Sequence, residues 1–120
     1  MVSQDVAPRE VTALARNVRG SSKKLQIIVN TVRGKRVEDA VNILRVLPSP
    51  QARKVLKVVK SATANAENNF QMDPARLRIV KVAAEAGPTL RRMRARARGR
   101  ANVIRKPTCH IRVVVTEEEA

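Results

Sequence analysis

The feature that most constrains the fold is a long run without acidic residues. From Ala86 to Thr116 there is no Asp or Glu, whereas nine residues are Lys or Arg. Between Arg92 and Arg100 arginine recurs at every second position. Charge at this density leaves almost no apolar surface to bury, so the middle of the run cannot lie in a hydrophobic core. It must form either a loose loop or an extended arm that projects from a body built by the rest of the chain.

The segments on either side of the run favour the extended arm. "RLRIVKVAAEAG", residues 76–87, and "TCHIRVVVT", residues 108–116, alternate in polarity and are rich in β-branched residues, which is typical of strands. If these strands pair, the ladder continues outward as a basic β-hairpin arm over residues 83–107, turning near Ala97–Gly99. At roughly 3.3 Å per residue this arm would reach about 40 Å.

The two-residue period of a strand would then place the arginines on one face of the arm and Met93, Ala95 and Ala97 on the other. Two-stranded ribbons are marginally stable in water, so we expect the arm to become ordered on an RNA partner. The alternative is a disordered basic loop, because chains of this composition are usually disordered in isolation.

The remaining residues predict a compact α+β body. Apolar residues at helical spacing indicate three amphipathic helices, over residues 20–35, 37–47 and 51–68. Residues 10–19 alternate as a strand, in a phase that the pattern leaves open: Val11, Ala13 and Ala15 compete with Leu14, Arg16 and Val18. We therefore expect three helices packed on a small three-stranded antiparallel sheet, with a long protruding β-hairpin. Residues 9–116 would form a single domain, between a flexible N-terminus (1–8) and an acidic flexible tail (117–120).

The charge predicts a polyanionic partner. The chain carries 25 Lys and Arg against 10 Asp and Glu, a net charge of +15, and 17 of the 25 are arginine. A field of this sign indicates nucleic acid, and arginine suits bidentate phosphate contacts. Phe70 is the only aromatic residue, which counts against proteins that stack single-stranded bases on aromatic side chains.

Catalytic and metal chemistry find no support in the residues. His110 is the only histidine, and no pattern of Ser, Cys or carboxylate accompanies it as a triad would require. The single cysteine, Cys109, excludes an internal disulfide and a Cys-type zinc site, and we expect it to be a small buried apolar residue. We predict a protein that is not an enzyme and has no metal or cofactor. Residues 1–9 lack a signal peptide and no run is apolar enough to span a membrane, which predicts a cytoplasmic protein.

Several segments, in order and spacing, resemble one known family, ribosomal protein twenty-two of the large subunit in its bacterial-type form. Arg91, then "RARGR" (residues 96–100), then His110 followed by alternating aliphatic residues, is similar to the family signature. "SSKKLQIIVNTVRGKRVEDAVNIL" resembles the first two helices of the family, "SATANAENN" the end of the third, and "EAGPTLRR" the entry to its hairpin. The resemblance covers about residues 9–116.

The resemblance implies a structural constituent of the large ribosomal subunit that binds 23S-type rRNA and supports subunit assembly. Its hairpin would line the nascent-peptide exit tunnel near the constriction, with macrolide antibiotics binding nearby. The partners would be large-subunit rRNA, neighbouring large-subunit proteins and the nascent polypeptide. The location would be the cytoplasm, in the large ribosomal subunit, with an organellar origin left open. Many relatives carry proline where Ala95 stands.

The resemblance and the charge map together predict two sets of site residues. The expected rRNA-binding residues are Arg16, Arg19, Lys23, Lys24, Arg33, Lys35, Arg91, Arg92, Arg94, Arg96, Arg98, Arg100, Arg105, Lys106 and His110. The expected exit-tunnel tip comprises Leu90, Arg91, Arg92, Met93, Ala95, Arg96, Ala97, Arg98, Gly99 and Arg100.

Two other classes remain open from the residues alone: a non-specific DNA-binding protein of the nucleoid type, and a cationic membrane-active peptide. The absence of Trp, and of Phe or Leu opposite the charges, counts against the latter. The basic outer face of the third helix is equally open between simple solvation and RNA contact.

Overall fold

A three-stranded antiparallel sheet forms the centre of the body, and the last strand of the chain is its middle strand. The computed structural model describes residues 10–117. The strand order is β1 (Glu10–Arg19), β5 (Thr108–Glu117) and β2 (Leu77–Ala86). Both neighbours pair with β5 in antiparallel register, Val11 opposite Val115 and Val82 opposite Val113.

Two β-bulges interrupt the alternation in the sheet, and the one in β1 decides the phase that the sequence left open. In β1 the register shifts between Ala15 and Val18, so Val11 and Ala13 are buried before the bulge and Val18 packs on the core after it. Each of the two competing phases is therefore right for one part of the strand. An extra residue in one strand reverses the alternation beyond it, which a strictly periodic pattern cannot represent.

The bulge in β2 acts in the same way, between Ile79 and Lys81. It allows Ile79 and Val82, three residues apart, both to face the core, while Val80 is exposed. The strict alternation expected for residues 77–82 therefore holds only as far as Ile79.

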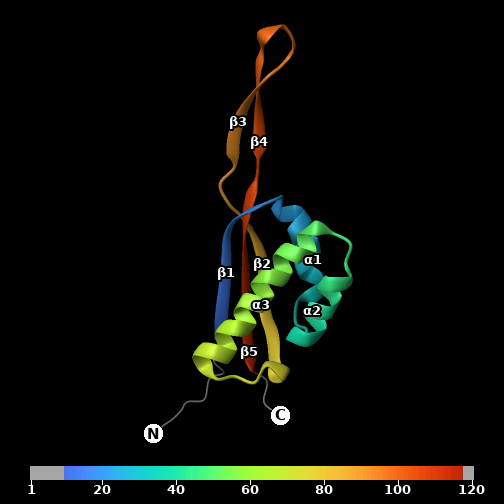
Figure 1. Cartoon of the computed structure of the whole chain (residues 1–120), viewed down its shortest axis with the longest axis vertical. Helices are drawn as coiled ribbons and strands as arrows, with labels where there is room; N and C mark the ends of the chain where they lie inside the picture. The colour runs from blue at the N-terminus through green and yellow to red at the C-terminus, as the bar shows by residue number, and fades with distance from the viewer. Residues whose placement is uncertain (1–9, 118–120) are drawn as a thin grey trace.

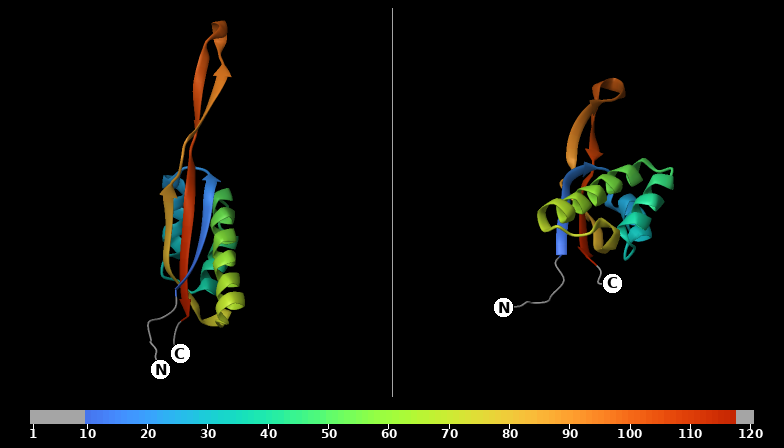
Figure 2. Two further views of the ribbon diagram at one scale, coloured as in Figure 1. Left: turned by 90° about the vertical axis from the view of Figure 1, so that its left-hand side faces the viewer. Right: turned by 60° about the horizontal axis from the view of Figure 1, so that its bottom comes forward.

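Three helices cover one face of this sheet and leave the other face open (Figure 1, Figure 2). They are α1 (Ser22–Val32), α2 (Val37–Val46) and α3 (Pro50–Phe70). The apolar residues that recur at helical spacing within residues 20–35 are the buried residues of α1, which confirms this amphipathic helix: Leu25, Ile28, Val29 and Val32. Pro50 is the first residue of α3, where the missing amide hydrogen costs nothing. Ser49 caps this helix by accepting a hydrogen bond from the Gln51 amide at 3.2 Å.

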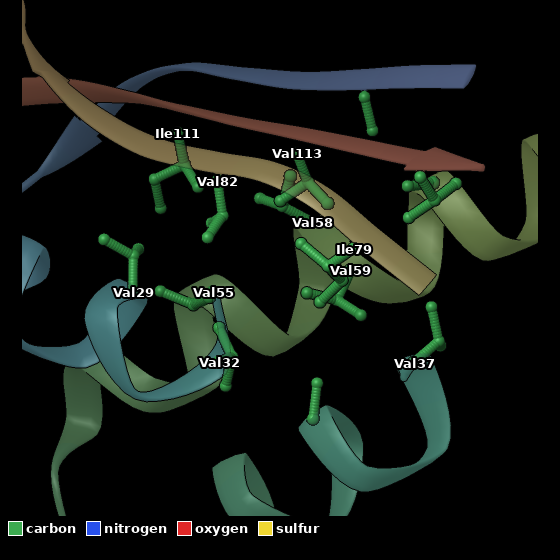
Figure 3. Close-up of a cluster of buried hydrophobic side chains, with 14 of the residues drawn as sticks. Val29, Val32, Val37, Val55, Val58, Val59, Ile79, Val82, Ile111 and Val113 are labelled. Carbon is green, nitrogen blue, oxygen red and sulfur yellow. The ribbon is translucent and has the colours of Figure 1, made fainter. Parts of the chain in front are cut away.

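The core lies between the helices and the sheet and consists almost entirely of aliphatic side chains. Figure 3 shows Val29 and Val55 from two helices facing Val82 and Ile111 from two strands. Val58 of α3 also belongs to this core, at 5% exposure. Burial of these side chains supplies the driving force for folding the body.

The basic run forms a separate two-stranded arm, as the sequence predicted. It consists of β3 (Leu90–Ala95) and β4 (Ala101–Lys106), paired in antiparallel register and joined by a short 3-10 turn, η2 (Ala97–Gly99). The molecule measures 72 × 33 × 20 Å, with a radius of gyration of 18.1 Å. A compact chain of this length would have a radius of gyration of about 14 Å, so the arm accounts for the elongated shape (Figure 1).

The boundaries of the arm differ slightly from the expected 83–107. Residues 83–86 belong to β2 and pair with β5, so the body sheet extends four residues into the predicted arm. A second short 3-10 helix, η1 (Pro74–Arg76), leads into β2. Glu117, expected in the flexible tail, is the last residue of β5, and its carboxylate accepts a hydrogen bond from the Asp73 amide at 2.7 Å. The predicted flexible N-terminus (1–8) and residues 118–120 lie outside the described part of the chain.

Candidate nucleic-acid interface

The arm presents a dense positive charge that is exposed everywhere except at Lys106, which is half-buried. Every residue from Arg91 to Arg100 is exposed, and between Leu90 and Lys106 no acidic residue offsets the cations. The basic residues of the arm are Arg91, Arg92, Arg94, Arg96, Arg98, Arg100, Arg105 and Lys106. Like charges this close repel one another, so the arm is complementary to a polyanion that supplies counter-charge along its length.

The expected alternation holds for Arg92 and Arg94 against Met93 and Ala95, but Arg91 and Arg105 place cations on the second face of the arm as well. Arg92 pairs with Ile104 and therefore lies on one face, whereas Arg91 pairs with Arg105 on the other. Met93 shares that second face with its partner Val103, and both are exposed. An arm that is basic all round suits a position with phosphates on more than one side.

The tip turns at the predicted place through two successive left-handed residues. Arg98 has φ 60° and Gly99 has φ 70°, and the Arg96 amide donates to the Arg100 carbonyl at 2.5 Å. Glycine adopts this conformation freely, whereas arginine does so at a cost of about 1–2 kcal/mol. The turn also ends the strand alternation, so Arg98 projects from the tip and not from a face of the ribbon.

The arm joins the body through a tightly bonded neck. The Gly87 amide donates to the Thr108 carbonyl at 2.9 Å, and the Gly20 amide donates to the Pro107 carbonyl at 3.1 Å. The Thr108 hydroxyl donates to the carbonyl of Pro88. A Cβ on Gly87 would lie 2.9 Å from Thr108 Oγ1 and 3.1 Å from His110 Cε1, so the neck has no room for a side chain there.

A cleft of about 380 Å³ lies at the root of the arm, on the sheet face that the helices leave open. Its lining residues are Leu14, Arg16, Asn17, Glu85, Pro88, His110 and Arg112. The Arg112 guanidinium lies 3.9 Å from the Glu85 carboxylate. His110 Nδ1 accepts a hydrogen bond from the Asn17 amide at 3.2 Å, at the bulge where Asn17 has φ 57°.

The structure brings some of the predicted rRNA-binding residues of the body together at the neck. Arg16 and His110 line the same cleft, and Arg19 pairs with Thr108 at the end of β1. Lys23 and Lys24 are exposed in the first turn of α1, close in sequence to Gly20, which is bonded to the neck.

The other predicted residues of the body, Arg33 and Lys35, follow the C-terminal end of α1 and form hydrogen bonds within the body. Arg33 donates to the Val82 carbonyl at 3.2 Å, and the Lys35 carbonyl accepts from the Ile79 amide at 2.9 Å. Both residues remain exposed, so these hydrogen bonds occupy only some of their polar groups. On the basic face of α3, Lys54 donates to the Arg19 carbonyl, whereas Arg53, Lys57 and Lys60 are exposed.

Sequence reasoning missed Arg112 as a site residue. Arg112 follows His110 by two positions in β5, so both side chains lie on the open face of the sheet. The same alternation that identified the strand could have placed them together. The contributions of Glu85 and Pro88 could not have been found, because only the pairing of β2 with β5 brings them to this face.

Cys109 lies beneath the neck as the small buried apolar residue that the sequence predicted. It is fully buried, and its Sγ lies 3.7 Å from the Val18 carbonyl, to which the thiol donates. Burial raises the pKa of the Cys109 thiol, and the Lys54 ammonium opposes that rise. Residues 10–117 contain no group of three or more His, Cys, Asp or Glu that could hold a metal ion, and none of their helices is long and apolar enough to cross a bilayer.

Comparisons with known proteins show which family the chain resembles. The profile described as ribosomal protein L22p/L17e matches residues 13–116. The large ribosomal subunit protein uL22 of Thermoanaerobacter sp. (strain X514) is 47% identical over 110 residues, which is 92% of this chain and 99% of the relative. The uL22 proteins of Dehalococcoides mccartyi (strain CBDB1) and Clostridium novyi (strain NT) are each 48% identical over 108 residues, 90% of this chain, covering 99% and 97% of the relatives.

Proposed function

The chain belongs to the ribosomal protein L22p/L17e family, and from that premise we propose that its arm and the basic surface at the arm's root bind large-subunit rRNA. The family is one of structural ribosomal constituents, and the protein is not an enzyme. The observation that carries the proposal is the arm itself, with eight cations, seven of them exposed and Lys106 half-buried, and no acidic residue between Leu90 and Lys106.

Such an arm needs its partner for stability as well as for charge balance. Its two strands bury no side chain of the core, and an isolated ribbon of this kind is marginal in water. Arginines on both faces would bind phosphates from more than one RNA segment, which joins parts of the rRNA and so promotes assembly of the subunit.

The second part of the proposal concerns the tip. From Gly87 to Arg98 the extended chain spans about 36 Å at roughly 3.3 Å per residue, so the tip lies far from the body. We propose that the tip, from Leu90 to Arg100, lines the nascent-peptide exit tunnel near its constriction, in contact with the nascent polypeptide. The rRNA-binding and tip residues are those expected from the sequence, and macrolide antibiotics would bind near this tip.

Co-sedimentation with ribosomal subunits tests the proposal. The full chain should sediment with large subunits and remain bound through a salt wash that strips loosely held basic proteins, because contacts inside folded rRNA cannot be released one at a time. Release at modest salt, with recovery on DNA, would contradict rRNA binding and support the nucleoid-type alternative. Crosslinks from residues 92–100 to rRNA would show where the tip lies.

A further inference from the structure

We propose that the cleft at the root of the arm holds a single unpaired rRNA nucleotide, extruded from its stack. The proposal rests on the proposed rRNA binding and adds to it a defined kind of RNA element and a defined place. The phosphate would lie on Arg16 and Arg112, and the base would enter the cleft toward His110 and Glu85.

The size of the cleft suits one nucleotide. Its volume of about 380 Å³ is near the lower end for small-molecule sites, which run from roughly 300 to 1,000 Å³. A continuous RNA duplex presents a broad surface and has no element that enters a hollow of this size. Proteins that recognise RNA sequence mostly bind bases that are splayed out of single-stranded loops and bulges.

The walls of the cleft supply what a splayed base requires. Pro88 and the partly exposed Leu14 are apolar, and the His110 ring and the Arg16 and Arg112 guanidinium groups are planar. Bases stack on histidine rings and on guanidinium planes as well as on larger aromatic residues. The scarcity of aromatic residues in this chain therefore does not prevent base stacking at this position.

The polar groups of the cleft are oriented before any ligand binds. Because His110 Nδ1 accepts the Asn17 amide hydrogen, the proton of the neutral ring is on Nε2, which is left as a donor. Within residues 10–117 this Nε2 makes no hydrogen bond of its own. Glu85 provides the opposite function as an acceptor for a base amino group, and its half-exposed side chain is tied loosely to Arg112.

The neck holds this arrangement in place. Gly87 leaves no space between the chain and the His110 ring, and the hydrogen bonds from Gly87 to Thr108 and from Gly20 to Pro107 tie the ends of β2 and β1 to the chain where β5 begins. A site that is already formed loses less conformational entropy when it binds, which favours the extruded nucleotide over a mobile surface contact.

Chemical probing of full-length 23S-type rRNA, with and without the full chain, tests the proposal. Reagents that modify the Watson–Crick edges of unpaired bases should find one nucleotide that the protein protects and that lies outside the footprint of the arm. Arg112→Gln should restore the reactivity of that nucleotide and weaken binding by roughly threefold to tenfold. Arg45→Gln is the control, because Arg45 is an exposed cation on α2, which covers the opposite face of the sheet.

Two substitutions of His110 test the roles of its two ring nitrogens separately. The oxygen of His110→Asn can replace Nδ1 as the acceptor for Asn17 but cannot replace the Nε2 donor, whereas the amide nitrogen of His110→Gln can replace Nε2. His110→Asn should restore the reactivity of the protected nucleotide, whereas His110→Gln should keep it protected. Thermal melting of both variants shows whether each is still folded. Arg112 is exposed, so Arg112→Gln remains informative if either histidine variant is unstable.

Protection unchanged by Arg112→Gln and His110→Asn would overturn the nucleotide site, and would point to a protein side chain as the occupant of the cleft. Loss of protection confined to paired nucleotides would overturn it as well, in favour of simple phosphate contact. If the unmodified chain gives no footprint at all, the proposed rRNA binding fails. If the arm still protects the rRNA and the cleft variants have no effect, only the nucleotide site is refuted and the proposed rRNA binding stands.

Discussion

Removing the arm should leave the body folded while abolishing most of the salt-dependent RNA affinity. The perturbation is replacement of residues 90–106 by a short Gly-Ser-Gly linker between Thr89 and Pro107. No buried core residue lies in the deleted segment, since the buried side chains of the described chain come from residues 11–82 and 108–115. Shortening the connection reduces the entropy cost of closing it, which favours the body by up to about 1–2 kcal/mol.

The expected loss of affinity follows from the charges. Eight cations leave with the arm, and each contact between a cation and a phosphate contributes about −0.7 to −0.9 to the slope of log affinity against log salt. If all eight contact phosphate, the slope of the intact chain exceeds that of the deletion by about 6 to 7. Each doubling of the salt concentration should then reduce the advantage of the intact chain by roughly 100-fold.

Filter binding to 23S-type rRNA over a series of potassium chloride concentrations measures the slope, and circular dichroism during heating measures the body. The intact chain and the deletion should melt within a few degrees of one another, in curves dominated by the helices. Global unfolding of the deletion would refute the division into body and arm. Equal salt slopes for the two proteins would refute the assignment of the RNA contacts to the arm.

Three further predictions concern single residues. Arg98→Gly removes the left-handed strain at the tip, worth about 1–2 kcal/mol, and should therefore increase the protection of the arm's amide hydrogens from exchange. It should also lower the slope of log affinity against log salt by about 1. An unchanged rate of amide hydrogen exchange would mean that the turn carries no strain. Gly87→Ala places a methyl group 2.9 Å from Thr108 Oγ1 and should reduce the free energy of unfolding by about 1–3 kcal/mol in urea titrations, and an unaffected midpoint would show that the neck yields easily. Because burial raises the pKa of the Cys109 thiol, the unfolded chain releases this proton first, so stability should fall as pH rises above about 8.5, the ordinary thiol pKa. Denaturation at about pH 7.5 and about pH 9.5 should show a smaller fall for Cys109→Ala, and equal falls would contradict this origin.

The body illustrates how far local pattern carries a prediction. The helical stripe of α1 identifies its buried face, because periodicity in a helix depends on neighbours within two turns. The phases of β1 and β2 were not predictable, since each depends on a bulge. A bulge arises from pairing with a strand that lies far away in the sequence, and nothing in the ten residues of β1 alone indicates it.

The arm shows the same division at the level of function. Its projection from the body, its turn near Ala97–Gly99 and its affinity for a polyanion were predictable from charge and from the flanking strands. The consecutive Arg91 and Arg92 already fall on opposite faces of a strand by alternation alone. The face of Arg105 was not predictable, because it depends on the register Arg91 opposite Arg105, and the direction of Arg98 depends on its left-handed backbone.

The amino-acid sequence by itself determined the class of this protein: a basic α+β body with an arm too charged to be buried, similar to one ribosomal family over most of its length. Only the tertiary structure decided how the open face of the sheet is used. The bulge at Asn17 orients the His110 ring, and the pairing of β2 with β5 brings Glu85 beside Arg112. Charge and periodicity are properties of short segments, whereas a cleft exists only where segments distant in the chain meet.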